Sequence, residues 1–393
     1  MLIDYLTEAH RLSGELSALR REFHQYPELG NHEFKTADRI ELFLKELGIP
    51  TKRILETAVM GQLKGALPGP SIALRADMDA LPLQEETGID YPSRIPGIMH
   101  ACGHDVHITA VLGAAKLLSG HREELEGTIL LLFQPDEEGN GGAQRMIRAG
   151  VLEGVSAVFG AHVTPELPAG HIGVRYGKFY AASDTFKITV TGKSAHGAER
   201  EKGIDALAAA SEIVGGLLEL QHYSSEKSVI TVGTFHGGTA GNIVADRAEL
   251  TGIIRTLGPE ARKQMRTRVL ETVRDTAAKS GAQARCELHE SYPGVVNDGS
   301  MTQLVEEAAR SVFKSHGDAW LGSDLVHVIE EPLMMTEDFG YFLQERPGSF
   351  YHIGAGCPLP LHNPGFLPDE KSIVTAAAVH AAVAVRGLST FAQ

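Results

Sequence analysis

The spacing of apolar residues predicts helices at both ends of the chain. Leu6, Leu12, Leu16 and Leu19 recur near one face of a helical period, which predicts a helix over residues 4–22. This helix ends before Pro27, because the residue preceding a proline avoids the helical conformation. The same reasoning predicts further helices over residues 33–47, 299–315, 336–345 and 369–386, the last of them rich in alanine.

Short, continuous apolar runs predict strands between these helices. They cover residues 58–66, 71–76, 127–133, 155–160 and 349–354, and a turn at 68–70 separates the first two. A strand that is apolar throughout is typical of a parallel sheet covered on both faces. A longer apolar run from Ile108 predicts a buried helix after the second strand. These elements predict an α/β domain.

The pattern changes from about Ala182, which predicts a second domain. Residues 184–191 alternate as a half-exposed antiparallel strand does. Elements of the order β-α-β-β-α-β, typical of a ferredoxin-like α+β domain, follow over residues 184–191, 203–221, 228–235, 244–257, 259–280 and 282–289. Residues suited to metal binding resume after it. We therefore predict one domain made of residues 1–181 and 293–393, with residues 182–292 inserted between its two parts.

Composition narrows the class of protein. The 393 residues fit two domains at roughly 150 residues each, and 43% hydrophobic with 22% charged residues is ordinary for a soluble protein. A net charge of −14 disfavours a nucleic-acid partner. Three widely spaced cysteines favour a reducing compartment. With neither a signal-peptide pattern nor an apolar run near the roughly 20 residues that cross a membrane, we expect a cytoplasmic protein without a membrane partner.

The densest chemistry lies in residues 99–107, which hold three histidines, a cysteine and an aspartate. Cys102 and His104 alternate, so in an extended turn both can face one point. A thiolate and an imidazole are ligands suited to zinc or a similar transition metal. The predicted helix from Ile108 places the cluster at a helix start, where free N–H groups favour such a site. The alternative is a buried thiol beside surface histidines.

Acidic residues and a histidine follow three of the predicted strands. Asp77 and Asp79 follow the second, Glu137 and Glu138 follow the third, and His162 follows the fourth. Ligands of open α/β sheets bind at this edge. Consecutive acids there need a positive partner such as a metal, and one carboxylate can bind it while its neighbour takes a proton from water. The alternatives are capping aspartates and a solvated acidic loop.

These motifs together resemble the M20 family of metallopeptidases and amidohydrolases. The resemblance is strongest to aminoacylase-like enzymes, which include hippurate hydrolases, auxin-conjugate hydrolases and N-acetyl-diaminopimelate deacetylases. The matching segments occur in the family's order over nearly the whole chain, at residues 23–29, 75–82, 99–107, 134–139, 160–162 and 361–364. The Cys-Gly-His-Asp stretch within residues 99–107 is distinctive of this subfamily.

The resemblance implies a zinc-peptidase-like catalytic domain with an inserted lid or dimerisation domain. It implies two divalent metal ions per subunit, with zinc favoured by the cysteine and manganese, cobalt or nickel as alternatives. Carried over by motif, the metal ligands are Cys102, His104, Glu138, His162 and His362. Glu137 would be the general base that activates a metal-bound water, and Asp79 would orient a ligand imidazole.

The resemblance also assigns residues of the inserted domain to the active site. His196 would reach the reacting centre, often from a partner subunit, and stabilise the tetrahedral intermediate. Asn242 and Arg255 would hold the carboxylate end of the substrate. The implied assembly is a homodimer or a larger oligomer built from dimers.

Three departures from the family pattern bear on substrate choice and on the geometry of the lid. Asp136 stands where relatives have alanine, which adds a negative charge beside the base. Residues 193–200 read Lys-Ser-Ala-His-Gly-Ala-Glu-Arg, where relatives have Gly-Gly-His-Ala followed by a proline. The turn after Asn242 reads Ile-Val-Ala-Asp in place of Val-Ile-Pro.

The function that follows is hydrolysis of the amide bond of small N-acyl amino acids. A dipeptidase or carboxypeptidase would use the same chemistry and differ in what fills the acyl pocket. A non-catalytic metal-binding protein is the third reading, and Glu137 beside a full set of ligands argues against it.

Overall fold

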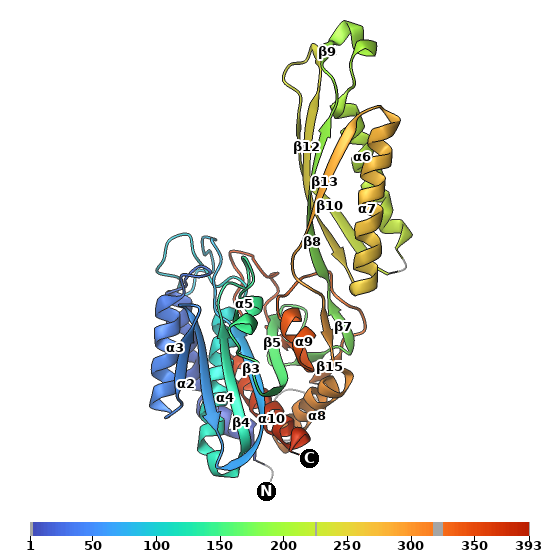
Figure 1. The fold of residues 1–393 in the computed structure, drawn as a ribbon. Helices are drawn as coiled ribbons and strands as arrows, with labels where there is room; N and C mark the ends of the chain where they lie inside the picture. Colours follow the sequence, from blue (N-terminus) through green and yellow to red (C-terminus); the bar gives the residue numbers. More distant parts are fainter. Residues whose placement is uncertain (1–2, 225, 317–324, 393) are drawn as a thin grey trace. The chain divides into compact units, whose positions relative to one another are not determined.

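The computed structural model describes residues 3–224, 226–316 and 325–392, and it divides into two compact units (Figure 1). Unit 1 consists of Met1–Gly177, Asn297–Glu330 and Tyr341–Gln393. Unit 2 consists of Lys178–Val296 and Glu331–Gly340. Unit 2 therefore includes a segment, Glu331–Gly340, that was predicted to belong to the domain made of residues 1–181 and 293–393.

Unit 1 contains a mixed eight-stranded sheet. Its order is β1 (Thr51–Ile54), β2 (Ala58–Lys64), β4 (Glu126–Gln134), β3 (Leu67–Asp77), β5 (Val155–Thr164), β16 (Gly348–Gly354), β6 (Ile172–Val174) and β15 (Val326–Val328). The four central strands β4, β3, β5 and β16 are parallel. The turn predicted at residues 68–70 instead lies within β3, where the pairing with β4 shifts between Leu67 and Ser71.

In unit 1, one predicted helix is divided, another is much shorter, and the structure adds helices that were not predicted. They are α1 (Tyr5–Arg11), α2 (Ser13–Gln25), α3 (Phe34–Glu46), α4 (His104–Gly120), α5 (Gly142–Arg148), α8 (Gly299–His316) and α10 (Lys371–Phe391), with η1 (Arg122–Glu124). The single helix predicted over residues 4–22 is two, because the Leu12 N–H bonds back to Ala9 O and closes α1. The helix predicted over 336–345 is only α9 (Gly340–Glu345), since the Glu337 side chain accepts from Phe339 N in the preceding turn.

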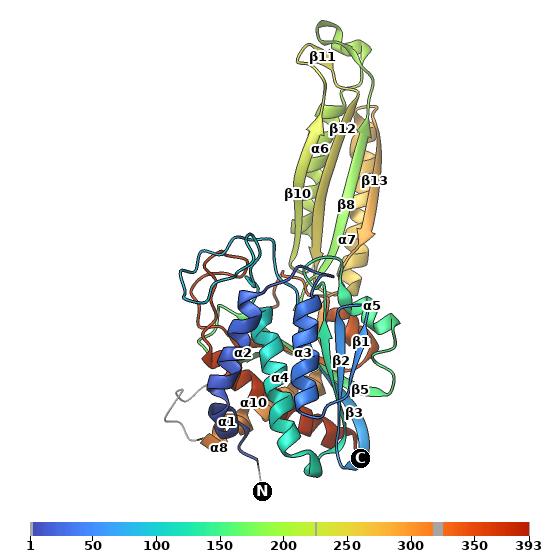
Figure 2. The same ribbon diagram turned by 90° about the vertical axis from the view of Figure 1, so that its left-hand side faces the viewer.

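Helices α4 and α10 pack against each other and against the central strand β3. Figure 2 shows α2, α3 and α4 side by side. Among the described residues, α10 is long and apolar enough to cross a membrane, but 78% of its apolar window is buried inside the protein. A buried share of this size is that of a core helix, and its alanines allow the close approach to α4.

Unit 2 has the element order predicted from the sequence. The elements are β8 (Ala182–Thr191), α6 (Ala206–Glu219), β10 (Ser228–Gly237), β12 (Arg247–Thr256), α7 (Pro259–Lys279) and β13 (Gln283–Glu290). The strands form an antiparallel sheet of order β10-β12-β8-β13, and α6 and α7 pack on it around one apolar core.

Short elements complete the described structure. The strands β9 (Ala195–His196) and β11 (Ile243–Val244) pair with each other, as do β7 (Gly177–Tyr180) and β14 (Val295–Asn297). The 3-10 helices η2 (Gly197–Lys202) and η3 (Leu220–Tyr223) flank α6.

Candidate active site

The register of the parallel strands brings the predicted site residues to one level of the sheet. Asp77 at the end of β3 pairs with Gln134 at the end of β4. Because Arg75 pairs with Gly160, His162 of β5 lies at the level of Asp77. His162 lies within β5, which continues to Thr164, and not after the strand end predicted at residue 160. The carboxyl edge of the sheet therefore gathers these groups at one place.

The start of α4 places Cys102 and His104 beside β5. Gly103 is the N-cap residue of α4, with a φ of +84° that favours glycine. A Cβ at Gly103 would also collide with the Val163 side chain. Glycine thus permits both the left-handed turn and its close approach to β5. His104 is the first residue of the helix and has no exposed side-chain surface.

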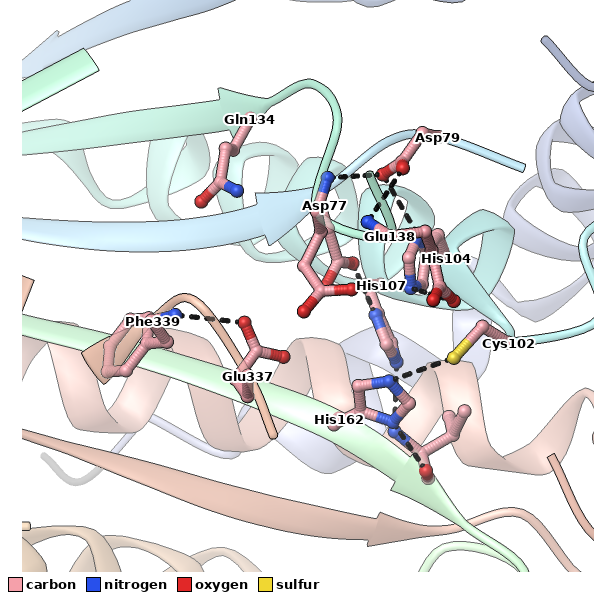
Figure 3. A network of polar contacts seen from close by, with 12 residues as sticks. Asp77, Asp79, Cys102, His104, His107, Gln134, Glu138, His162, Glu337 and Phe339 are labelled. Atoms are coloured by element: carbon pink, nitrogen blue, oxygen red, sulfur yellow. Dashed lines mark hydrogen bonds and ion pairs between the residues drawn. The ribbon is translucent and has the colours of Figure 1, made fainter. Parts of the chain in front are cut away.

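All five predicted metal ligands meet in unit 1. Cys102 Sγ lies 3.3 Å from His162 Nε2 and 3.3 Å from His362 Nε2. His362 Nε2 lies 3.0 Å from Glu138 Oε1, which lies 3.9 Å from His104 Nε2. Figure 3 shows Cys102, His104, Glu138 and His162 converging from different elements. One thiol, three imidazoles and a carboxylate form a donor set that suits zinc-type divalent ions.

The surroundings of His104 fit a metal ion. Neither ring nitrogen makes a hydrogen bond with the described residues, although the side chain is fully buried. The nearest carboxylate oxygens are at 3.5 Å in Asp79 and 3.8 Å in Asp77. Burial alone would lower the pKa of His104, but Asp77, Asp79 and Glu138 raise it to about 10. Buried imidazole nitrogens that lack a hydrogen bond and lie among carboxylates fit a site that binds a cation.

The Cys102 thiol leads to the same conclusion. Burial raises the pKa of Cys102 well above its ordinary value, and the charges of Glu138 and Glu137 raise it further. The thiolate that binds metal is therefore disfavoured in this site unless a positive ion is present.

Asp79 holds the two consecutive glutamates by their backbone. Its Oδ1 accepts from Glu137 N and its Oδ2 from Glu138 N, both at 3.0 Å. Asp79 also lies 3.5 Å from His104 Nδ1. Glu137 is 6% exposed, so its carboxylate is nearly excluded from bulk water. Asp79 therefore sets the position of the predicted base and of a predicted ligand together.

A buried chain of polar contacts beneath the site was missed by the sequence reasoning. His107 Nδ1 lies 2.6 Å from Asp77 Oδ1, and Val163 N donates to His107 Nε2 at 2.8 Å. Arg75 donates to Asp77 at 2.7 Å and to Gln134 at 2.9 Å. His107 accepts at Nε2, so it donates from Nδ1 and both ring nitrogens are engaged. The available signal was the three-residue spacing from His104, which puts His107 on a neighbouring face of the helix.

The additional charge at Asp136 is paired. Arg145 donates to Asp136 Oδ2 at 2.9 Å, and Asp136 N donates to Glu33 Oε1 at 2.9 Å. Asp136 has a φ of +58°, a conformation that aspartate tolerates better than most residues. Its carboxylate fills the space beside Gly30 and Gly139, where a Cβ would collide with it.

The structure separates the three site residues predicted in unit 2. His196 in β9 pairs with Ile243 in β11, and Gly197 N donates to Asn242 O at 2.8 Å, so His196 and Asn242 are neighbours and both are exposed. Arg255 lies near the opposite end of β12, where it pairs with Ser183 and Val229. The eight residue-to-residue steps of strand from Arg247 to Arg255 span about 27 Å.

Arg255 has the character of an anion-binding group. Its guanidinium forms no hydrogen bond or ion pair with the rest of the described chain, and partial burial lowers its pKa. A half-buried guanidinium without a counter-charge is free to bind a carboxylate.

Comparison with known proteins shows the family to which the chain belongs. The family model "Peptidase family M20/M25/M40" matches residues 73–386. The chain is similar to the N-acetylcysteine deacetylase of Bacillus subtilis, with 38% identity over 95% of this chain and 96% of the relative. It is also similar to thermostable carboxypeptidase 1 of Saccharolobus solfataricus, with 37% identity over 94% of each chain.

A solved structure agrees with these relatives. The Bacillus subtilis protein YXEP, described as a dinuclear metal-binding peptidase from the M20 family, superposes with a TM-score of 0.86. The two sequences are 37% identical, and the match covers 97% of this chain and 99% of YXEP. The resemblance predicted from the motifs is thereby confirmed: the chain belongs to peptidase family M20/M25/M40 and is an amide-cleaving hydrolase.

Proposed function

We propose that the protein is a metal-dependent amidohydrolase that releases free amino acids from small N-acyl amino acids. The observation that carries this proposal is the convergence of five side chains suited to metal binding. One of them is Glu138, and Asp79 holds the backbone of both Glu138 and the adjacent Glu137. The similarity to an N-acetylcysteine deacetylase over nearly the full length supports this substrate class.

The chain's own residues define how the ions would be held. Cys102, His104, Glu138, His162 and His362 would bind two divalent ions, and the thiol favours zinc over harder metals. When bound, such ions supply Lewis acidity, which makes water more acidic and stabilises negative charge on an amide oxygen. Asp79 and Asp77 would orient the ligands from behind.

Glu137 would carry the proton through the reaction. Its carboxylate takes a proton from the attacking water as the carbon–oxygen bond forms at the amide carbonyl. It then donates this proton to the amide nitrogen, so that the carbon–nitrogen bond breaks with a neutral amine as leaving group. The fixed backbone at residue 137 keeps the carboxylate in one place for both transfers.

The geometry of unit 2 supports a homodimer. The strands β9 and β11 lie beyond one end of β12 (Figures 1 and 2). His196 lies in β9 and Asn242 directly precedes β11, whereas Arg255 lies near the other end of β12. An N-acyl amino acid is much shorter than the roughly 27 Å of strand that separates them. If these residues act on one substrate, His196 and Asn242 come from one subunit and Arg255 from the other.

Three cysteines without disulfides further support a reducing, cytoplasmic location.

Hydrolysis of a substrate panel tests the proposal. The purified protein is assayed with N-acyl amino acids and free dipeptides, before and after chelation and after addition of zinc, manganese, cobalt or nickel. We expect release of amino acid from N-acyl substrates, loss on chelation and recovery with metal. Retention of full activity after complete metal removal would refute the metal-dependent mechanism.

A peptidase is the second candidate, and one observation favours it. The similarity to thermostable carboxypeptidase 1 is almost as high as that to the deacetylase. Cleavage of dipeptides or C-terminal residues, together with inactivity on N-acyl amino acids, would establish this candidate in place of the first.

A further inference from the structure

A network of four ionisable side chains lies buried beneath the candidate metal centre. Arg20 Nε lies 2.8 Å from Asp105 Oδ2, and His24 Nδ1 lies 2.8 Å from the same oxygen. His24 Nε2 lies 3.2 Å from Glu85 Oε1. The exposed fraction of all four side chains is 3% or less. Arg20 and His24 are one turn apart on α2, whereas Asp105 and Glu85 come from other segments of unit 1.

The network is electrically balanced. Burial alone would lower the pKa of His24, but hydrogen bonds to Asp105 and Glu85 raise it above the ordinary value. Burial would raise the pKa of Glu85, but the contact with His24 lowers it. Both ring nitrogens of His24 thus face carboxylate oxygens, and Asp105 also faces the Arg20 guanidinium. Because desolvation of charges offsets much of their mutual attraction, such a network contributes less to stability than an apolar core would, which leaves a role in positioning.

One branch of the network reaches His104. Asp105 is the next residue after His104 in the first turn of α4, and its Oδ1 accepts from Val106 N at 2.9 Å. The other oxygen is held by Arg20 and His24. The backbone that carries the His104 ligand is therefore tied to α2.

The other branch reaches His362 through a loop. Glu85 accepts from Ser93 N at 2.5 Å and from the Thr87 hydroxyl, so it closes the loop that contains it. The next residue, Glu86, donates its N–H to Pro364 O at 2.8 Å. Pro364 lies two residues beyond His362.

His362 depends on such support. Its φ is +62°, an unfavourable conformation for a non-glycine residue, and its side chain is 51% exposed. Its N–H donates to Ala101 O at 2.9 Å, beside Cys102. A strained residue on a loop keeps one conformation only when the surrounding contacts hold it.

We propose that Arg20 and His24 position two metal ligands at once, His104 through Asp105 and His362 through Glu85 and Glu86. These two residues of α2 are positioning residues and touch neither substrate nor metal. The inference rests on the proposed function, since it requires that His104 and His362 bind metal.

Zinc binding to Glu85→Gln tests the inference. Stoichiometry and stepwise affinity are measured by titrating zinc into chelator-treated protein against a competing chelator. Glu22→Gln is the matched control, because Glu22 lies on the same helix α2 and pairs with Arg39 outside the network, and its side chain is 48% exposed. We expect the variant to weaken the ion that His362 holds by about 10–100-fold, the range typical when a supporting partner of a ligand is lost. The control should bind as the wild type does.

The outcomes separate the inference from the function on which it rests. Two zinc ions with wild-type affinity in Glu85→Gln would overturn the inference and leave the proposed function standing. A wild-type protein that binds no zinc or other divalent ion would overturn both. If Glu85→Gln does not fold, His24→Asn breaks the link to Glu85 from the other side and also the contact with Asp105, so weaker binding of both ions is expected. Unchanged affinity in a folded His24→Asn protein would likewise overturn the inference.

Discussion

Asp79 and Glu137 are joined by a hydrogen bond of 3.0 Å from the Glu137 N–H to Asp79 Oδ1. The second oxygen of Asp79 holds Glu138 N in the same way. Asp79→Asn replaces one carboxylate oxygen with an NH2 group. This NH2 group would face one of the two backbone N–H groups, and that hydrogen bond would be lost. We expect kcat to fall by about 10–100-fold, with a smaller change in KM, because misplacement of the base weakens proton transfer. Asp38→Asn, at an exposed pair with Arg53, is the control and should keep wild-type kinetics.

Glu137 and Glu138 should respond differently to the same change. In Glu137→Gln the proton carrier is lost while the ligands remain, so turnover should fall by about 10²–10⁴-fold with metal still bound. Glu138→Gln should instead lose metal. Metal analysis beside single-turnover rates distinguishes the two variants. Metal loss in the first and retention in the second would mean that the two roles are reversed.

The Asp136–Arg145 pair should contribute to stability, because without Arg145 the buried Asp136 carboxylate has lost its positive partner. Asp136 is 4% exposed and Arg145 is 36% exposed. Arg145→Met strands a buried carboxylate, and allowing for the exposure of the arginine we expect a loss of about 1–3 kcal/mol in the free energy of unfolding. Asp136→Asn combined with Arg145→Met should recover most of it. Denaturant titration of the wild type, the two single variants and the double variant measures the coupling free energy between the two side chains. If the double variant lost as much unfolding free energy as Arg145→Met, the unpaired carboxylate would be excluded as the cause of the loss.

Glu33 should make stability fall as the pH rises. Burial raises its pKa from the ordinary 4.5 to about 7. The folded protein therefore binds a proton that the unfolded chain releases, so the contribution of Glu33 is complete below pH 4.5 and is lost as the pH rises to about 7. Glu33→Gln keeps an acceptor for Asp136 N without this loss.

The corresponding measurement is the unfolding free energy of chelator-treated protein between pH 4 and pH 8. The variant should equal the wild type at the acid end and exceed it by about 3 kcal/mol above pH 7. Parallel pH profiles for the two proteins would show that Glu33 is ionised at neutral pH in the folded state.

Mixing two inactive variants should restore activity if each site uses two subunits. In a heterodimer of His196→Ala and Arg255→Ala, one site lacks both residues and the other has both. Random exchange of subunits makes half of the dimers heterodimers, so about a quarter of wild-type activity should return. Each variant alone is the control. No recovery after demonstrated subunit exchange would place both residues in the site of their own chain.

Several strands of the sheet, and the edge that carries the site residues, could be predicted because burial leaves a direct signal in the sequence. Continuous apolar runs identified β3, β4 and β5, and the polar residues at their ends identified Asp79, Glu138 and His162. Short strands such as β1, β6 and β15 have too few residues to show a period. The pairing of Asp77 with His107 was not predictable, because it depends on how α4 packs on the sheet.

The same limit applies to the conformation of single residues. His362 was found by its motif, but its left-handed backbone and its link to Glu86 through Pro364 depend on contacts between distant segments. The charge at Asp136 was visible in the sequence, whereas its partner Arg145 depends on the turn that the backbone makes between them.

Cys102 and His362 touch although they stand 260 positions apart in the chain. During synthesis, the ribosome completes all of unit 2 before the residue that finishes the donor set emerges. A nascent chain therefore carries Glu137 and most of the proposed metal ligands well before the proposed site is complete. In the folded protein, an ion bound by both Cys102 and His362 would cross-link an early and a late segment of the chain. Chelators should then accelerate unfolding as well as stop catalysis.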